Sequence, residues 1–525
     1  MNNRIVAFSI FVGIVLLTIF LPACDSFHRN KSYAAVPVSS IKEGKALAEA
    51  YCQSCHSLPD PSMLNATIWE KGALPYMGPW LGIFSHNFRK YPSAKNDRML
   101  ERGFYPDTPV LTSQEWQHII DYYTATSPDS LPEQVRTQPI RMTLPLFDLQ
   151  LPAFQYNNAT TSLVKIREND NLHSLLISDA ATKKTFFFNK SLHLVDSLLT
   201  SGPIVNIDLF ENSMLTCNIG MLNPNNGNQG KAVYINKKKT NGWSEDSVSV
   251  FKNLRRPVQV SATDFNNDGS KDFLICEFGF MTGALCWMEN TGNGNYRRHV
   301  LRSLPGAAKA HIQDYNNDGK MDIWVLFAQG EEGVFLYTNE GNGKFSEQQV
   351  LRFPPMYGSS YFELADFNGD GFPDIVYTCG DNADYSPVLK PYHGVYIFMN
   401  DGRNGFKQKY FFPIHGCYKA MARDFDKDGD LDLATISYFA DYAKQPEEGF
   451  VYLENKGSFR FQPYSIEAAK RGRWLTMDAG DIDGDGWIDL VLGNFCLGPT
   501  SSQSKFDWRA APPFILLKNK GRYKE

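Results

Sequence analysis

The hydrophobic pattern divides the chain near residue 140. Before that point apolar residues recur at helical spacing: after a capping box at Thr112–Glu115, Trp116, Ile119, Ile120 and Tyr123 follow the i, i+3, i+4, i+7 pattern of a buried helix face. After it, short apolar runs typical of buried strands alternate with stretches rich in Asp, Asn and Gly. The pattern predicts a small helical unit followed by a long β-rich unit.

One nine-residue pattern recurs five times in the β-rich part. It starts at Asp264 (DFNNDGSKD), Asp314 (DYNNDGKMD), Asp366 (DFNGDGFPD), Asp424 (DFDKDGDLD) and Asp481 (DIDGDGWID). The starts are 50, 52, 58 and 57 residues apart, a period typical of propellers, solenoids and repeat arrays. Each copy lies between two strand-like runs, and an aromatic-rich strand ending in Asn follows. Each repeat therefore predicts a four-stranded blade.

Two degenerate repeats, at residues 175–189 and 214–236, come before the first clear copy and lack the nine-residue loop. Together with the five copies they predict seven blades, a number that closes well into a ring. The last blade lacks an outer strand after Asn519, whereas residues 142–154 offer a strand before the first blade. We expect this N-terminal strand to close the ring.

The recurring loop has the composition of a site for a hard cation. Oxygen-bearing side chains occupy loop positions 1, 3, 5 and 9, glycine occupies position 6, and the carbonyl of position 7 is a further possible ligand. This set suits Ca²⁺. An EF-hand is excluded, because position 12 is never Glu and lies in a strand-like run. The other interpretation is a set of polar turns that bind nothing.

About five Ca²⁺ ions are thus predicted. Their predicted ligands are Asp264, Asn266, Asp268, Asp272, Asp314, Asn316, Asp318, Asp322, Asp366, Asn368, Asp370, Asp374, Asp424, Asp426, Asp428, Asp432, Asp481, Asp483, Asp485 and Asp489. The repeats resemble the FG-GAP/VCBS family of calcium-binding β-propellers, found in integrin α-chains and in secreted bacterial proteins. The resemblance implies the fold but says little about activity, because propellers host unrelated functions.

The helical part contains one motif with definite chemistry. A capping box at Ser40–Glu43 predicts a helix that leads into Cys52-Gln-Ser-Cys55-His56. C-x-x-C-H is the attachment pattern of haem c: two thiols are spaced to bond the haem vinyl groups, and the adjacent imidazole can bind the iron. A redox disulfide and half of a zinc site are the alternatives. The adjoining His and the lack of a second Cys pair nearby favour one covalent haem c.

Residues 39–127 resemble a small class I cytochrome c, with one helix before the motif, a Pro-rich loop, and a final amphipathic helix. The resemblance implies a Met as second axial ligand of the iron. Met77, in the apolar loop Leu-Pro-Tyr-Met-Gly-Pro, fits best, and Met63, Met99 and His86 are its competitors. Thioether ligation suits electron transfer, whereas an open sixth position would suit small ligands or peroxide.

The first 23 residues read as an export signal. Arg4 precedes an apolar stretch from Ile5 to Leu21, and Leu-Pro-Ala-Cys24 follows. This resembles the lipobox of bacterial lipoproteins, which implies cleavage before Cys24 and a lipid on its thiol. An uncleaved anchor helix is the alternative. Either way the predicted protein is exported and anchored to a bacterial membrane, facing the periplasm or the cell surface.

The predicted order of segments is a signal peptide at 1–23, a tether at 24–38, the helical domain at 39–127, a linker at 128–140 and the propeller at 141–525. A net charge of −5 gives no basic bias towards nucleic acid. Cys276 and Cys286 lie on presumed neighbouring strands, so a disulfide between them is left open.

No catalytic residue is predicted, since nucleophile elbows, zinc motifs, phosphate-binding loops and dinucleotide fingerprints are lacking. The inner strands do place polar residues towards the propeller axis. These positions would be wet, or they could bind an anionic or sugar-like ligand or carry out proton transfer. These residues include Lys309, His311, Gln313, Glu363, Lys419, Arg423 and Asp478.

Three functions follow from these patterns. The first is a membrane-tethered haem electron carrier whose calcium-stabilised propeller binds a redox partner protein or a carbohydrate or protein ligand. In the second, the propeller is an enzyme, a sugar or alcohol dehydrogenase or a lyase, with the haem as electron outlet. The third is a calcium-dependent adhesion module. The haem motif favours the first, because it is the only chemistry that the sequence states directly.

Overall fold

The computed structural model describes residues 29–168, 170, 172–238, 242–383, 387–500 and 502–521. The predicted signal peptide and the predicted lipidation site Cys24 lie outside the described residues. None of the helices in the described part of the chain combines the length and the apolar character needed to cross a membrane.

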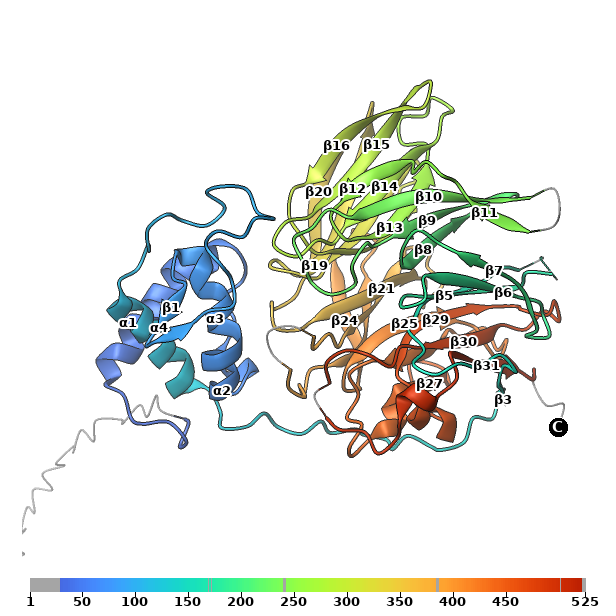
Figure 1. The fold of residues 1–525 in the computed structure, drawn as a ribbon. Helices are drawn as coiled ribbons and strands as arrows, with labels where there is room; N and C mark the ends of the chain where they lie inside the picture. Colours follow the sequence, from blue (N-terminus) through green and yellow to red (C-terminus); the bar gives the residue numbers. More distant parts are fainter. Residues whose placement is uncertain are drawn as a thin grey trace, which may run out of the picture.

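A helical unit forms the N-terminal part (Figure 1). Helices α1 (Val38–Tyr51) and α4 (Ser113–Thr126) pack against each other, and α2 (Ala66–Ile68) and α3 (Leu74–Met77) lie between them in sequence. The unit has its own core, which includes Trp116 and Ile119. It also contains a two-stranded ladder of β1 (Ser85–His86) and β2 (Arg89–Lys90), so the predicted all-α composition is corrected.

The two predicted capping boxes have different outcomes. Thr112 and Glu115 form the predicted box: the Thr112 N–H donates to Glu115 Oε2 (2.7 Å) and the Glu115 N–H donates to Thr112 Oγ1 (3.2 Å). The box predicted at Ser40 is wrong, because α1 already begins at Val38 after Pro37. The Ser40 hydroxyl is turned towards α4, where it donates to Asp121 Oδ2 at 2.5 Å. Ser40 therefore joins the two helices and does not cap α1.

The propeller consists of seven antiparallel sheets, so the predicted blade number is confirmed (Figure 1). The first blade contains β4 (Thr161–Ile166), β5 (Leu175–Asp179), β6 (Lys184–Phe188) and β7 (Leu194–Leu199), and the second contains β8 (Ile204–Leu209), β9 (Ser213–Asn218), β10 (Gly230–Lys237) and β11 (Trp243–Glu245), with β12 (Phe251–Leu254) also paired to β10. The third blade contains β13 (Pro257–Thr263), β14 (Asp272–Glu277), β15 (Ala284–Gly292) and β16 (Asn295–Arg302), the fourth contains β17 (Ala307–Gln313), β18 (Asp322–Phe327), β19 (Gly333–Gly341) and β20 (Lys344–Arg352), and the fifth contains β21 (Ser359–Ala365), β22 (Asp374–Cys379), β23 (Gly394–Asn400) and β24 (Phe406–Pro413). The sixth blade contains β25 (Cys417–Arg423), β26 (Asp432–Ser437), β27 (Phe450–Asn455) and β28 (Phe461–Tyr464), and the seventh contains β29 (Trp474–Gly480), β30 (Asp489–Asn494), β31 (Phe514–Asn519) and β3 (Phe147–Gln150).

The ring is closed by the N-terminal strand, as predicted. Strand β3 pairs antiparallel with β31, so that Phe147 lies opposite Asn519 and Gln150 opposite Leu516. The outer edge of the last blade is thereby paired by a segment that comes before the first blade in sequence. This pairing ties the two ends of the propeller together.

Apolar side chains fill the space within and between the blades. One core cluster contains Phe147 from β3 together with Phe425, Tyr452 and Trp474 from the last two blades. Cys276 and Cys286 are both buried free thiols, on adjacent strands but one step out of register, with Cys276 opposite Leu285. The structure thus contains no disulfide between them.

The segment predicted as a linker, 128–140, is fixed to the propeller over its second half (Figure 1). Gln134 Nε2 donates to the His393 carbonyl (2.8 Å), and Arg136 Nε donates to the Pro413 carbonyl (2.9 Å). The Arg136 guanidinium also forms an ion pair with Glu448, whose side chain is fully buried. The segment therefore connects the two units as a bound strap.

We expect Arg136→Met to destabilise the propeller by about 3–5 kcal/mol, because Glu448 would stay buried without a positive partner. His415 also contacts Glu448 (3.1 Å), but burial lowers the pKa of His415 to about 4, so at pH 7 it is neutral and supplies no charge. Urea unfolding at pH 7, followed by tryptophan fluorescence, measures the change.

The matched control is Lys444→Met, which removes an exposed ion pair between Lys444 and Glu133 from the same strap. Exposed ion pairs contribute about 1 kcal/mol or less to the free energy of unfolding. Equal shifts of the unfolding midpoint in both variants would contradict a special role for Arg136.

Candidate functional site

Each inner strand runs from one face of the propeller to the other. Strand β17, for example, begins just after Pro305, which faces the helical unit, and ends directly before the cation loop that starts at Asp314. The helical unit and the five cation loops therefore lie at opposite faces of the propeller. Two candidate sites follow, one at each face.

The first site is a cavity of about 360 Å³ between the helical unit and the propeller. The helical wall contains Cys52, Cys55 and His56 of the C-x-x-C-H motif, and Met77. Loops of the third, fourth and fifth blades supply the opposite wall. Residues on the two walls include Tyr51, Cys52, Cys55, His56, Met77 and Trp80, and Met281, Gln329, Glu332, Met356, Asp381 and Lys390.

The side chains of the motif fit a covalent haem. Cys52 and Cys55 are free thiols, and burial raises the pKa of Cys52 to about 11. The imidazole of His56 has its Nδ1 at 2.9 Å from the Ser57 carbonyl, so its Nε2 remains available as an iron ligand. Burial lowers the pKa of His56, which favours the neutral form that binds metals. These groups can hold haem c through two thioether bonds and one axial nitrogen.

Of the four candidates for the second axial position, Met77 has the best placement. The described residues that line the cavity include Met77 but not Met63, Met99 or His86. Met99 is 60% exposed, and His86 Nε2 lies at 2.8 Å from the Gln117 side chain. Met77 as an iron ligand stays a prediction, now with a position that suits it.

Contacts between the two units hold the cavity in place. The Tyr392 hydroxyl lies within hydrogen-bonding distance of the carbonyl oxygens of both Met63 and Met356, 3.2 Å from each. Asn226 Nδ2 donates to Asp97 Oδ2 (2.9 Å), and Met356 packs against the core of the helical unit. The propeller is therefore a structural part of the cavity wall.

Two buried charged groups of opposite sign lie on the propeller wall. Glu332 is 3% exposed and accepts hydrogen bonds from the N–H (2.9 Å) and the hydroxyl (2.6 Å) of Ser359. Burial raises the pKa of Glu332 to about 7 and lowers that of Lys390 to about 8. Sequence reasoning missed both, because neither belongs to a motif and only the docking of the helical unit places them here.

We expect Glu332→Gln to become progressively more stable than the wild type as pH rises from about 5 to about 8. The folded-state pKa of about 7 lies above the ordinary value of 4.5, so the stability that the protonated carboxyl contributes is fully present only below about pH 4.5 and is lost as pH rises through 7. The difference in the free energy of unfolding between the variant and the wild type should reach at most about 3 kcal/mol. Urea unfolding across this pH range measures it, with Glu340→Gln, at an exposed site, as control. A pH-independent difference would contradict the shift.

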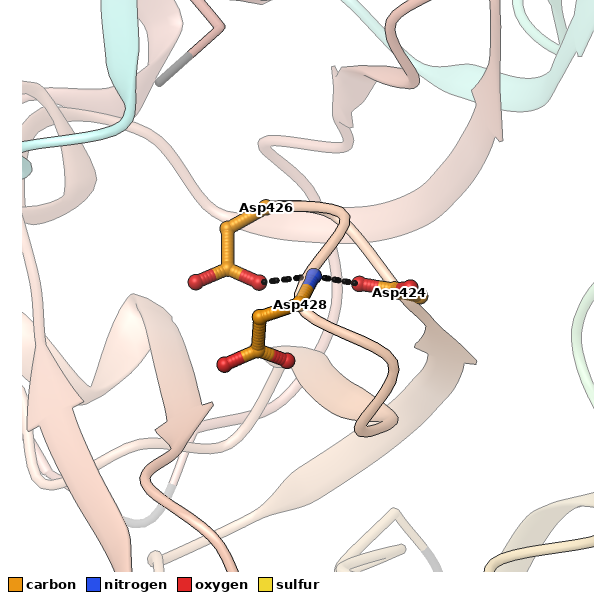
Figure 2. Close-up of side chains that lie close together, drawn as sticks. All are labelled: Asp424, Asp426 and Asp428. Atoms are coloured by element: carbon orange, nitrogen blue, oxygen red, sulfur yellow. Dashed lines mark hydrogen bonds between the residues drawn. The ribbon is translucent and has the colours of Figure 1, made fainter. Parts of the chain in front are cut away.

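The second site is the set of cation loops. Figure 2 shows the loop in which Asp424, Asp426 and Asp428 bring their carboxylates together, with oxygens within 4.8 Å of one another. The Asp428 N–H donates to Asp424 Oδ1 (3.0 Å) and Asp426 Oδ1 (3.2 Å), which folds the loop around the cluster. Gly429 at position 6 has φ of 96°, a conformation that favours glycine. Asp481, Asp483 and Asp485 form an equivalent triplet.

The aspartates at position 9 have a different setting from those at positions 1, 3 and 5. All five are fully buried, and in the Asp424 loop Asp432 lies outside the triplet. Asp432 accepts hydrogen bonds from the N–H groups of Phe425 (3.3 Å) and Asn455 (2.7 Å). The same pair of bonds, from position 2 and from the Asn at or near the end of the third strand, recurs in every copy. The aspartate at position 9 thus joins the loop to the third strand of the blade by hydrogen bonds. Its role as a cation ligand stays a prediction.

Basic side chains contact some of these acidic loops. Lys518 Nζ contacts Asp483 and lies 3.7 Å from Asp485, and Lys320 Nζ lies 2.6 Å from Asp318. In the first blade, which lacks the nine-residue loop, Arg167 forms an ion pair with Asp170 (2.8 Å) at the corresponding turn. Sequence reasoning missed Lys518, since it lies 35 residues after Asp483 in the chain.

We expect calcium to raise the melting temperature, because an ion bound only by the folded state stabilises it. Asp426→Asn should reduce this rise, since it removes one of three clustered carboxylates. Asp430→Asn is the matched control: it makes the same charge change in the same loop, at a side chain outside the cluster. Differential scanning calorimetry with and without calcium compares them. An equal loss in both variants would argue for a general charge effect.

Comparisons with known proteins bear on the propeller. The family model described as FG-GAP-like repeat matches residues 264–325, 314–377 and 424–492. Cartilage acidic protein 1 of Mus musculus is 27% identical over 311 residues, covering 53% of this chain and 46% of that protein. Integrin alpha-4 of Xenopus laevis is 25% identical over 267 residues, covering 47% of this chain and 22% of that protein. The chain therefore matches less than half the length of these relatives.

Among solved structures, an Agrocybe aegerita lectin that recognises non-reducing terminal N-acetylglucosamine aligns with a TM-score of 0.37 and 15% identity, covering 66% of this chain and 94% of the lectin. The match to the family model and the sheet topology show that the protein carries FG-GAP-like repeats within a seven-bladed β-propeller.

Proposed function

We propose that the protein is a c-type haem electron-transfer protein whose propeller positions the haem and binds a partner or ligand. One observation carries the proposal: Cys52, Cys55, His56 and Met77 line a single cavity whose opposite wall is the propeller. When bound there, haem c supplies a one-electron redox couple.

The residues of the helical wall have separate roles in this proposal. Cys52 and Cys55 would bind the haem covalently, and His56, with its ring held by the Ser57 carbonyl, would bind the iron. Met77 would be the second ligand of the iron. The apolar side chains of Trp80 and Leu81 on the same wall limit the access of water.

The placement of the cavity constrains the redox partner. The propeller covers the side of the helical unit that carries the C-x-x-C-H motif, so a protein partner cannot dock flat on that side while the two units stay together. A small redox molecule that enters the cavity, or a partner protein that contacts its rim, fits this geometry. A carbohydrate or protein ligand could bind elsewhere on the propeller, whether the redox partner is a small molecule or a protein at the rim.

In this proposal calcium stabilises the propeller and a lipid anchors the protein. About five Ca²⁺ ions in the nine-residue loops would neutralise clustered carboxylates and stabilise the face opposite the haem. A lipid on Cys24 would anchor the exported protein to a membrane through the segment that precedes α1. Calcium in this scheme is structural and takes no part in electron transfer.

We expect the purified protein to show the absorption spectrum of a low-spin haem c, with a weak near-infrared thioether–iron band in the oxidised form. His56→Ala should lose the low-spin spectrum, and Met77→Ala should lose the near-infrared band, shift the haem towards the high-spin state and lower the reduction potential. Spectra and redox titrations of the three proteins test this. A high-spin haem that is unchanged in Met77→Ala would rule out Met77 as a ligand.

Two controls separate the roles of the sites. Met63→Ala alters a methionine outside the described cavity lining and should leave the near-infrared band intact. Asp428→Ala should lower the melting temperature in calcium and leave the haem spectrum unchanged, because its loop lies at the opposite face. Reduction of the haem by a sugar or an alcohol alone would instead support the enzyme alternative.

A further inference from the structure

A short hairpin on the helical unit carries a fully exposed phenylalanine. Strands β1 and β2 pair antiparallel, and Asn87 and Phe88 form the two-residue turn between them. The side chain of Phe88 is fully exposed, whereas the other exposed Phe and Trp side chains in the described part of the chain, Phe372 and Trp80, are 45% and 39% exposed. Phe88 therefore presents its whole ring to the surroundings.

The backbone of this turn has a conformation that favours glycine. Asn87 has φ of 45° and Phe88 has φ of 64°, as a type I′ turn requires, and the second position of such a turn is normally Gly. A bulky residue there is strained. In the sixth blade Phe459 also has φ of 61°, but its ring lies 5.9 Å from that of Phe367 and packs against a core cluster. Packing offsets the strain at Phe459, whereas the exposed ring of Phe88 gains no such packing.

The hairpin is held firmly at its base. Asn87 Nδ2 donates to Gln117 Oε1 (3.0 Å), and His86 Nε2 lies 2.8 Å from the same oxygen. The Tyr91 N–H donates to the Phe84 carbonyl (2.9 Å), just beyond the two strands. The turn therefore has a fixed position on the helical unit.

Basic side chains flank the exposed ring. Arg89 and Lys90 follow it directly and are exposed, and Arg89 Nη2 donates to the carbonyl of Lys71 (3.0 Å), another exposed lysine. Residues 85–90 include no acidic side chain. Lys71, Phe88, Arg89 and Lys90 are called the hairpin patch below. An aromatic ring beside cations suits an anionic lipid surface, where the ring enters the headgroup region and the cations attract the headgroups.

The hairpin patch lies beside the segment through which the chain enters the helical unit. The Tyr33 hydroxyl donates to Glu70 Oε2 (2.7 Å), and Glu70 directly precedes Lys71 of the patch. Tyr33 comes nine residues after Cys24, so the two lie at most about 30 Å apart. A lipid on Cys24 would therefore hold a bilayer within reach of the patch.

We propose that the hairpin patch contacts the surface of an anionic phospholipid bilayer, with Phe88 inserted among the headgroups. A convex turn with one apolar side chain fits a fluid lipid surface, which needs no matching pocket. Together with a lipid on Cys24, the hairpin would attach the helical unit at two points, and stable membrane binding generally takes two signals. The inference extends the proposed membrane anchoring and does not rest on the haem.

Flotation with lipid vesicles tests the patch. The chain from Asp25 onwards is used, because it keeps every described residue but lacks the predicted lipid site. We expect it to bind vesicles of phosphatidylethanolamine and phosphatidylglycerol about tenfold more tightly than vesicles of phosphatidylcholine, with a loss of affinity at high salt. Phe88→Ser should bind the anionic vesicles about fivefold more weakly. Phe372→Ser, the same change at an exposed Phe of a cation loop, should bind like the wild type.

Phe88→Gly gives a second measurement, and it is the test if Phe88→Ser does not fold. It creates the favoured Asn-Gly turn, so it should melt at or above the wild-type temperature while it loses vesicle binding. A lower melting temperature would instead assign the ring a structural role and count against the proposal. The haem spectrum of each variant reports on the electron-transfer function separately.

Two results would overturn the membrane contact. One is equal binding of the wild type to both kinds of vesicle, or no binding to either. The other is binding that is lost in Arg89→Gln or Lys90→Gln but kept in both Phe88 variants. That second result would indicate a site for a polyanion or an acidic protein.

Discussion

Closure of the ring by β3 and β31 is the constraint on which the rest of the structure depends. An open propeller would leave the last blade without its outer strand and expose the edge of β31. Because the closing strand comes from the N-terminal side of the chain, the preceding segment must run from the last blade across the propeller to the helical unit. Arg136 fixes this strap through its pair with the buried Glu448, and the helical unit is held against one face as a result. The same pairing that completes the propeller therefore also builds the cavity.

Compensation of charge is a second theme, repeated from blade to blade. Loop carboxylates are brought together by backbone hydrogen bonds, and each cluster needs positive charge to offset its repulsion. A cation suits the triplet around Asp426, Lys518 contacts the one around Asp483, and Arg167 takes this role in the first blade. Around the axis, Asp478 pairs with Lys165 and Glu363 pairs with Arg423. One repeat architecture thus places acidic loops at one face and ion pairs between the inner strands.

The two faces of the propeller carry different chemical groups. One face carries the acidic loops, and the other supplies a wall of the cavity that contains the C-x-x-C-H motif. The motif is therefore enclosed between two units, with Tyr392 bonded to both. This arrangement separates the stabilising chemistry from the redox chemistry in the proposed function. In that proposed function, a redox partner would reach the site at the rim formed by the propeller loops.

The sequence alone determined the propeller, because each repeat encodes its strands, its loop and its final Asn locally, and the period gives the number of blades. It also predicted the closing strand and the C-x-x-C-H and Met77 residues that the fold brings to one cavity. It failed at Ser40, which lies inside α1 and whose hydroxyl donates a hydrogen bond to Asp121 of α4. Only the tertiary structure decided that the predicted linker is a bound strap, that Cys276 and Cys286 lie out of register, and that Glu332 and Lys390 face the C-x-x-C-H motif. Those features depend on contacts between residues far apart in the chain, and local patterns carry no information about them.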